Sequence, residues 1–145
     1  MHNCLVGSEM CIRDSEKPMS PKLTLTIATV IALIFSLGMF FAPEFVTREQ
    51  FPNSDGQGFN DLVTLRYALA SVIFAIAIIS FHIRNIEGVK IQKIVMRGYT
   101  IAFSAVFFTN LVLHIAGKIS AIPPIIGTGF VAILSLITLI KLKKN

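Results

Sequence analysis

The chain alternates between four long apolar segments and short polar connections. The apolar segments cover residues 23–42, 62–81, 99–117 and 119–140. Each is about 20 residues long, which is the length that crosses the hydrocarbon core of a bilayer as a helix. The only Arg, Lys, His, Asp or Glu residues within them are Arg66 and His114. The pattern predicts an all-α fold, a polytopic four-helix transmembrane bundle, with helices at about 23–42, 62–82, 93–117 and 121–141.

Two other fold classes fit the pattern poorly. A soluble helical bundle would show a polar stripe of 3.6-residue period on each helix, and these segments have none. A transmembrane barrel would need alternating strands of about ten residues. The composition points the same way, since 54% of the 145 residues are hydrophobic and 14% are charged, against about 25% charged in soluble domains. These values exclude a disordered chain, a disulfide scaffold and almost any soluble enzyme.

The distribution of Lys and Arg over the short loops predicts the orientation of the bundle. If the N-terminus is cytoplasmic, the inner side holds most of the basic residues: Lys17, Lys22, Arg84, Lys90, Lys93, Arg97, Lys141, Lys143 and Lys144. The outer side then holds only Arg48 and Lys118. We therefore expect an N-in, C-in protein with both termini in the cytoplasm.

The inner loop carries a second basic feature. Lys90, Lys93 and Arg97 share one face of a helix at headgroup depth, so we expect them to contact inner-leaflet headgroups. The formal net charge of +5 is interpreted in the same way, as an attraction to anionic lipids of the inner leaflet. No nucleic-acid partner is expected. The longest outer connection, residues 43–61, is expected to be a loop at the membrane interface.

Small residues at helical spacing predict which helix faces approach one another, because lipid tails provide no hydrophobic drive for association. The stripes fall on all four helices: Ala28, Ala32 and Ser36; Ala68, Ser71 and Ala75; Gly98, Ala102, Ala105 and Thr109; and Thr128, Ala132 and Ser135. They predict packing and carry no functional information.

The first fifteen residues, MHNCLVGSEMCIRDS, resemble the translation of a transposase adapter used for shotgun, including metagenomic, sequencing libraries. Back-translation of residues 4–15 reproduces such an adapter. We therefore expect residues 1–18 to be a non-native or disordered tail and residues 19–145 to be the transmembrane domain. The alternative is a genuine flexible tail. Both cysteines, Cys4 and Cys11, lie in this segment and are not interpreted as a redox or metal motif.

Polar groups at membrane depth are the only functional leads, because ionisable residues there are costly. Glu44, Arg66, Asn110 and His114 are all predicted to lie near the outer leaflet. One interpretation is a pocket in which Arg66 binds an anionic group. A second is a structural Arg66–Glu44 pair, with Asn110 and His114 bonding between helices, and a third is an Arg66 that extends outward to the headgroups. We expect Arg66 to contact Glu44 or Asp61.

Several chemistries are excluded or disfavoured. His82 and His114 are predicted at opposite membrane faces, so they cannot hold one haem iron. Disulfide exchange lacks cysteines in the membrane domain, and residues 23–42 lack the embedded acid of small drug exporters. We expect no catalytic residue, no cofactor and no metal.

The chain resembles the small four-helix bacterial membrane proteins that include DoxX-like families. The resemblance is carried by Gly38 with Pro43–Glu44 at the exit of the first helix, by LRYALAS at 65–71, and by the basic C-terminal tail. It implies an inner-membrane protein, in some cases an accessory to a redox system, and it transfers no catalytic residue.

Two functions follow as hypotheses. The first is a non-catalytic accessory or assembly component, with membrane lipids and either a protein partner or a second copy of the chain as partners. The second is a small transporter or ligand-binding bundle that uses the outer polar cluster. A membrane enzyme ranks third.

Overall fold

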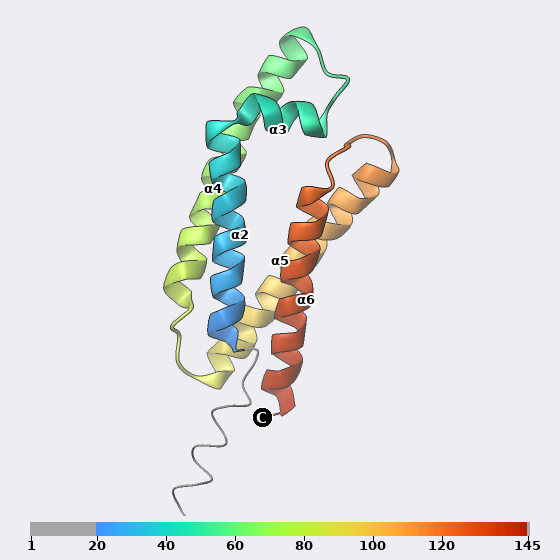
Figure 1. Ribbon diagram of the computed structural model, residues 1–145. Coiled ribbons are helices and arrows are strands. Elements are labelled where there is room, and N and C mark those ends of the chain that lie inside the picture. Colours follow the sequence, from blue (N-terminus) through green and yellow to red (C-terminus); the bar gives the residue numbers. More distant parts are fainter. Residues whose placement is uncertain (1–19, 145) are drawn as a thin grey trace, which may run out of the picture.

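The computed structural model describes residues 20–144, so the predicted tail at 1–18 lies outside the described residues. Within the described part, all regular secondary structure is helical and short loops connect the helices (Figure 1). Its elements are α2 (Pro21–Phe41), α3 (Pro43–Gln50), α4 (Gly56–Ile83), α5 (Val89–Ile115) and α6 (Pro123–Lys144). Four of these helices, all except α3, are long and apolar enough to span a membrane. The all-α, four-span prediction is therefore confirmed, and the protein is an integral membrane protein.

Local sequence explains the ends of α2. The Ser20 hydroxyl accepts a hydrogen bond from the Leu23 amide at 3.2 Å, and Pro21 occupies the first turn, where its missing N–H costs nothing. At the other end, the Ala42 amide donates to Gly38 O at 2.9 Å. Pro43 then follows and begins α3.

The connection predicted as a loop at residues 43–61 is mostly helical. Pro43 has the fixed φ angle of a first helical position, and the Thr47 hydroxyl donates back to its carbonyl oxygen at 2.7 Å within α3. α4 then starts at Gly56 (φ +58°) instead of at residue 62. α5 likewise starts earlier than predicted, directly after Gly88 (φ +97°). The loops are short because glycines with positive φ turn the chain sharply.

The long helices pack in the order α4, α2, α6, α5. The most extensive contacts are between α2 and α4 and between α5 and α6, and α2 joins the two pairs by packing on α6. α4 and α5 therefore lie at the two edges of an arc. They are linked by a hydrogen bond between the Ser80 and Tyr99 hydroxyls, near their shared loop.

The two helix pairs meet most closely at one end. We call it the terminal end, since Pro21 and the last turn of α6 lie there (Figure 1). Leu25, Met96 and Leu139 form a buried cluster at this end. Beside them, the Thr24 and Thr138 hydroxyls are hydrogen-bonded at 2.7 Å between α2 and α6.

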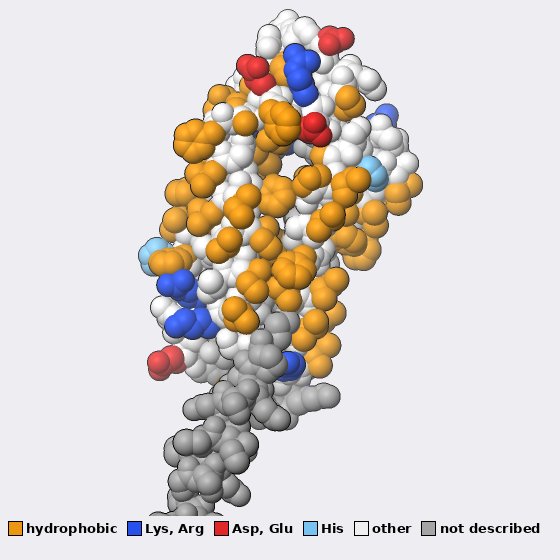
Figure 2. All heavy atoms as spheres, in the orientation of Figure 1, with side chains coloured by type: hydrophobic (Ala, Val, Ile, Leu, Met, Phe, Trp, Pro, Cys, Tyr) orange, Lys and Arg blue, Asp and Glu red, His pale blue; other side chains and the backbone are white. Residues whose placement is uncertain are grey.

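The two pairs separate toward the opposite end, which we call the α3 end (Figure 1). There α3 packs on α4 and α2. A single backbone hydrogen bond between described residues reaches across, from the Ser120 amide in the α5–α6 loop to Gln50 O at 3.0 Å. Figure 2 shows apolar side chains along the length of the bundle, with the acidic and basic side chains gathered at its two ends.

Candidate functional site

A cavity of about 380 Å³ lies between the two helix pairs. All four spanning helices and the last residue of α3 contribute to its walls. The lining residues are Ile31, Ala32, Phe35, Met39, Gln50, Arg66, Leu69, Ile73, Ile76, Ala102, Phe103, Val106, Asn110, Pro124, Gly127 and Thr128. Figure 2 shows an opening through the surface near the α3 end, between the two halves of the bundle. The volume falls in the range of small-molecule sites.

The polar lining residues gather near the α3 end of the cavity. Arg66 is in the α3-proximal half of α4, Gln50 ends α3, and Asn110 lies near the end of α5 that meets the α5–α6 loop. Farther from α3, the walls are aliphatic and aromatic, and Thr128 on α6 uses its hydroxyl internally, donating to Pro124 O at 2.7 Å. The cavity is therefore polar at one end and apolar along the rest of its length.

Among the described residues that line the cavity, Arg66 is the one that is charged, and it is only 5% exposed. The Nε–H donates to the Thr47 hydroxyl at 3.4 Å, and Nη2 donates to the Gln50 side-chain oxygen. The ring of Phe51 lies 5.7 Å from the guanidinium carbon. Both hydrogen-bond partners are neutral, so they hold the guanidinium in place without cancelling its charge.

The predicted ion pair of Arg66 is wrong. Glu44 and Asp61 are exposed, and the guanidinium bonds instead to the two polar side chains that α3 presents to it. The physical reason is the unpredicted helix: α3 places Glu44 in its first turn and Thr47 and Gln50 one and two turns further on, against α4. An Arg66 extended out to the headgroups is excluded by its burial.

The other candidate residues are distributed unevenly. Asn110 lines the cavity and donates from Nδ2 to Val106 O at 2.9 Å, so its bond lies within α5. His114 does not line the cavity, and its Nδ1 is 3.1 Å from Ile119 O in the α5–α6 loop. The structure thus brings Arg66 and Asn110 to one cavity and leaves Glu44 and His114 outside it.

Sequence reasoning missed Thr47 and Gln50. Their spacing of three residues places both on one face of a helix, whereas the sequence pattern predicts a loop at residues 43–61. The available signal is this spacing of polar residues in a segment that begins with Pro43, a residue suited to the first turn of a helix.

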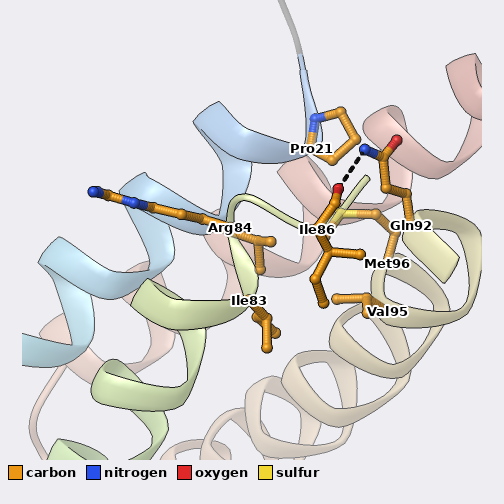
Figure 3. A pocket seen from close by; sticks show the side chains of 8 residues that line it. Pro21, Ile83, Arg84, Ile86, Gln92, Val95 and Met96 are labelled. Atoms are coloured by element: carbon orange, nitrogen blue, oxygen red, sulfur yellow. Dashed lines mark hydrogen bonds between the residues drawn. The ribbon is translucent and has the colours of Figure 1, made fainter. Parts of the chain in front are cut away.

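At the terminal end, the described residues form a much smaller hollow. A hollow of about 10 Å³ lies among Pro21, Leu25, Ile83, Arg84 and their neighbours, which is about the space of one water molecule. Figure 3 shows Arg84 extending away from Ile86, Val95 and Met96. Its guanidinium carbon lies 3.8 Å from the centre of the Phe81 ring. Lys90, Lys93 and Arg97, the predicted headgroup contacts, lie in the first turns of α5 at this end.

Within the described residues, no three His, Cys, Asp or Glu side chains gather into a group that could hold a metal ion. His82 is in the last turn of α4, at the terminal end, and His114 is in the last turn of α5, at the α3 end. The two imidazoles therefore lie at opposite ends of the bundle.

Comparison of the chain with protein-family models, with curated proteins and with solved structures finds no match. The cavity beside Arg66 is the site on which a function can be argued.

Proposed function

We propose that this protein is a non-catalytic ligand-binding bundle that holds an anionic group at Arg66. The observation that carries the proposal is a buried arginine that lines a cavity and whose guanidinium is hydrogen-bonded, among the described residues, only to neutral side chains. None of the described residues that line the cavity has a carboxylate. The site therefore has the charge and the space for an anion.

The energetics favour an anion as the missing partner. A cation buried in an apolar environment is costly unless it is paired and hydrogen-bonded. Thr47 and Gln50 use two of the five guanidinium donors. The remaining donors suit a carboxylate or phosphate, which guanidinium binds through two parallel hydrogen bonds. An anion in the cavity would offset the cost of burying the charge.

The proposed setting is a bacterial inner membrane with both termini in the cytoplasm. Under the positive-inside rule, the basic terminal end faces the cytoplasm and the α3 end faces outward. The cavity then opens in the outer half of the bilayer. The resemblance to DoxX-like proteins supports the same placement.

A second candidate is an accessory component that docks on another membrane protein or on a second copy of the chain. It is favoured by α5, whose most hydrophobic stretch contains no residue that the bundle buries. Ile101 and Val112 on this helix are 72% and 62% exposed. A partner helix, instead of lipid, would cover this surface.

Native mass spectrometry of the full chain separates the two candidates. The wild-type protein should retain an anionic adduct, Arg66→Gln should lose it, and the matched variant Arg48→Gln should keep it. Arg48 is an exposed arginine on α3, so the control makes the same charge change outside the cavity. Equal adducts in all three proteins would contradict the proposal. A bound protein subunit in place of the adduct would favour the accessory role.

A further inference from the structure

We infer that the bound anion is the head group of a single-chain amphiphile, held with its head at Arg66 and its hydrocarbon chain along the cavity toward the terminal end. The inference rests on the proposed function and adds the class of ligand. It follows from how polarity, volume and openness are arranged around the same cavity.

The polarity of the cavity has a direction. Arg66 and Ile76 both line the cavity from α4, and ten residues of helix separate them by about 15 Å. Gln50 and Asn110 lie near the Arg66 end, and Ile73 and Ile76 lie toward the middle of the bundle. An inorganic anion would use only the polar end. A molecule with a charged head and an apolar tail matches both ends.

The volume favours one chain over two. One water molecule needs roughly 10–15 Å³ of cavity volume, so a cavity of about 380 Å³ holds roughly 25 to 40 groups of that size. That is enough for one acyl chain with its head group. A phosphatidic acid with two long chains has more non-hydrogen atoms than this, so its second chain would have to remain outside.

Access is from the bilayer. α4 packs on α2 and α5 packs on α6, while α4 and α5 are joined by the Ser80–Tyr99 hydrogen bond near their shared loop. Toward the α3 end, the two edges of the arc present apolar cavity-lining side chains: Leu69, Ile73 and Ile76 from α4, and Ala102, Phe103 and Val106 from α5. A lipid-soluble molecule can therefore enter the cavity laterally from the bilayer, between α4 and α5. The α3 end of the cavity is covered by α3 and by the Gln50–Ser120 hydrogen bond.

A second hollow, of about 360 Å³, provides an internal contrast. It lies between α2 and α6 and is lined only by apolar residues and glycine. Ile31, Phe35 and Gly127 line both hollows, so they form the wall between them. None of the described residues that line the second hollow could recognise a charged head group, so of these two hollows the Arg66 cavity is the selective one.

The head group that Arg66 recognises is a carboxylate or a phosphate. Guanidinium offers parallel N–H donors that match a carboxylate or a phosphate equally well in geometry. The test therefore uses both head groups. It also uses an anion without a chain, a chain without a charge, and a phosphate with two chains.

Tryptophan fluorescence can report the chain directly, because the protein contains no tryptophan. Phe103→Trp places the reporter in the cavity wall, and Phe108→Trp, at a position 60% exposed on the same helix, is the matched control. The full chain is placed in nanodiscs of neutral phospholipid. It is titrated with brominated fatty acid, brominated lysophosphatidic acid, brominated monoacylglycerol, bromopropionate and brominated two-chain phosphatidic acid.

The two single-chain anions should quench the Phe103→Trp reporter saturably, and Arg66→Gln should weaken them at least tenfold. Gln50→Glu is the second variant, should Arg66→Gln fold poorly, and should weaken them similarly. Quenching of the Phe108→Trp reporter should rise without saturation and ignore both substitutions, because it reports partitioning into the bilayer.

Two results would overturn the inference while leaving the anion site intact. They are bromopropionate binding as tightly as the fatty acid, and two-chain phosphatidic acid binding as tightly as the single-chain phosphate. Monoacylglycerol binding as tightly as the anions, or no anion responding to Arg66→Gln or Gln50→Glu, would overturn the proposed function together with the inference.

Discussion

The guanidinium of Arg66 on α4 donates to the side-chain oxygen of Gln50, the last residue of α3. The same Gln50 accepts the Ser120 amide on its backbone carbonyl at 3.0 Å. Gln50 therefore positions the buried charge and also links the two helix pairs at the α3 end. This relationship makes Gln50 the most informative position for substitution.

Gln50→Glu should reduce anion affinity at least tenfold without lowering the melting temperature. A carboxylate at this position would pair with Arg66 permanently and compete with the ligand for its donors. The backbone bond to Ser120 does not depend on the side chain, so the fold is retained. Anion titration and thermal unfolding in the same detergent measure both quantities.

The matched control is Glu49→Gln, which alters an exposed neighbour on α3 by one charge. Its anion affinity should stay within twofold of wild type. A Gln50→Glu protein that binds anions as tightly as wild type would show that the ligand does not use the Arg66 guanidinium.

The Thr24–Thr138 hydrogen bond should make a small, measurable contribution to stability. The Thr138 hydroxyl donates to Leu134 O at 2.9 Å, so it accepts from Thr24 across the α2–α6 contact. Such bonds in membrane proteins contribute about 0.6 kcal/mol on average. A double-mutant cycle of Thr24→Val and Thr138→Val, followed by denaturant unfolding in micelles, should give a coupling energy of about this size. Zero coupling would contradict the assigned contact.

Gly127→Ala should destabilise the protein by about 1–3 kcal/mol, the usual cost of overpacking. A methyl group at this position would lie 2.8 Å from the Phe35 ring, which must then move into one of the two hollows that it separates. Gly38→Ala is the control, since nothing lies within 4 Å of its new methyl group. Thermal unfolding should show a lower melting temperature for Gly127→Ala alone. Equal melting temperatures would contradict the α2–α6 approach.

Orientation can be measured by labelling engineered cysteines in intact cells. Gln57→Cys, at the start of α4, should react with an impermeant maleimide from outside, and Glu87→Cys, in the α4–α5 loop, should not. Both positions are exposed, so a difference reports the side of the membrane. The assay compares these variants against a background in which Cys4 and Cys11 are replaced by serine. Labelling of Glu87→Cys alone would invert the predicted topology.

The sequence predicted the packing of the central helices better than that of the edge helices. Ala28, Ala32 and Ser36 on α2 are buried as expected, as are Ala132 and Ser135 on α6. The predicted stripe on α4 is wrong, because Ala68, Ser71 and Ala75 are exposed and Ala70 and Ala77 are buried instead. α4 packs extensively on only one long helix, α2. Which of its two adjacent faces contacts α2 depends on how the four helices are arranged, and the local sequence pattern does not encode that arrangement.

The dependence on tertiary arrangement also explains why the stripe predicted on α5 is wrong and why the cavity could not be predicted from the sequence. All four residues of the predicted stripe, Gly98, Ala102, Ala105 and Thr109, are exposed because α5 lies at the edge of the arc. Arg66 and Asn110 could be singled out from their depth in apolar segments. Their shared cavity and the contact with Gln50 depend on how far the helix pairs separate and on α3. Both are properties of tertiary packing.

The most direct test of the central claim is a distance between Arg66 and a bound anion. Lysophosphatidic acid supplies a ³¹P nucleus, and ¹⁵N-labelled arginine supplies the guanidinium, so dipolar recoupling by solid-state NMR in membranes measures the distance. Because N–H···O⁻ bonds are about 2.8 Å long, we expect one guanidinium within about 4 Å of phosphorus. The coupling should vanish in Arg66→Gln and persist in Arg48→Gln. A coupling unchanged in Arg66→Gln, or absent from the wild type, would contradict an anion site at Arg66.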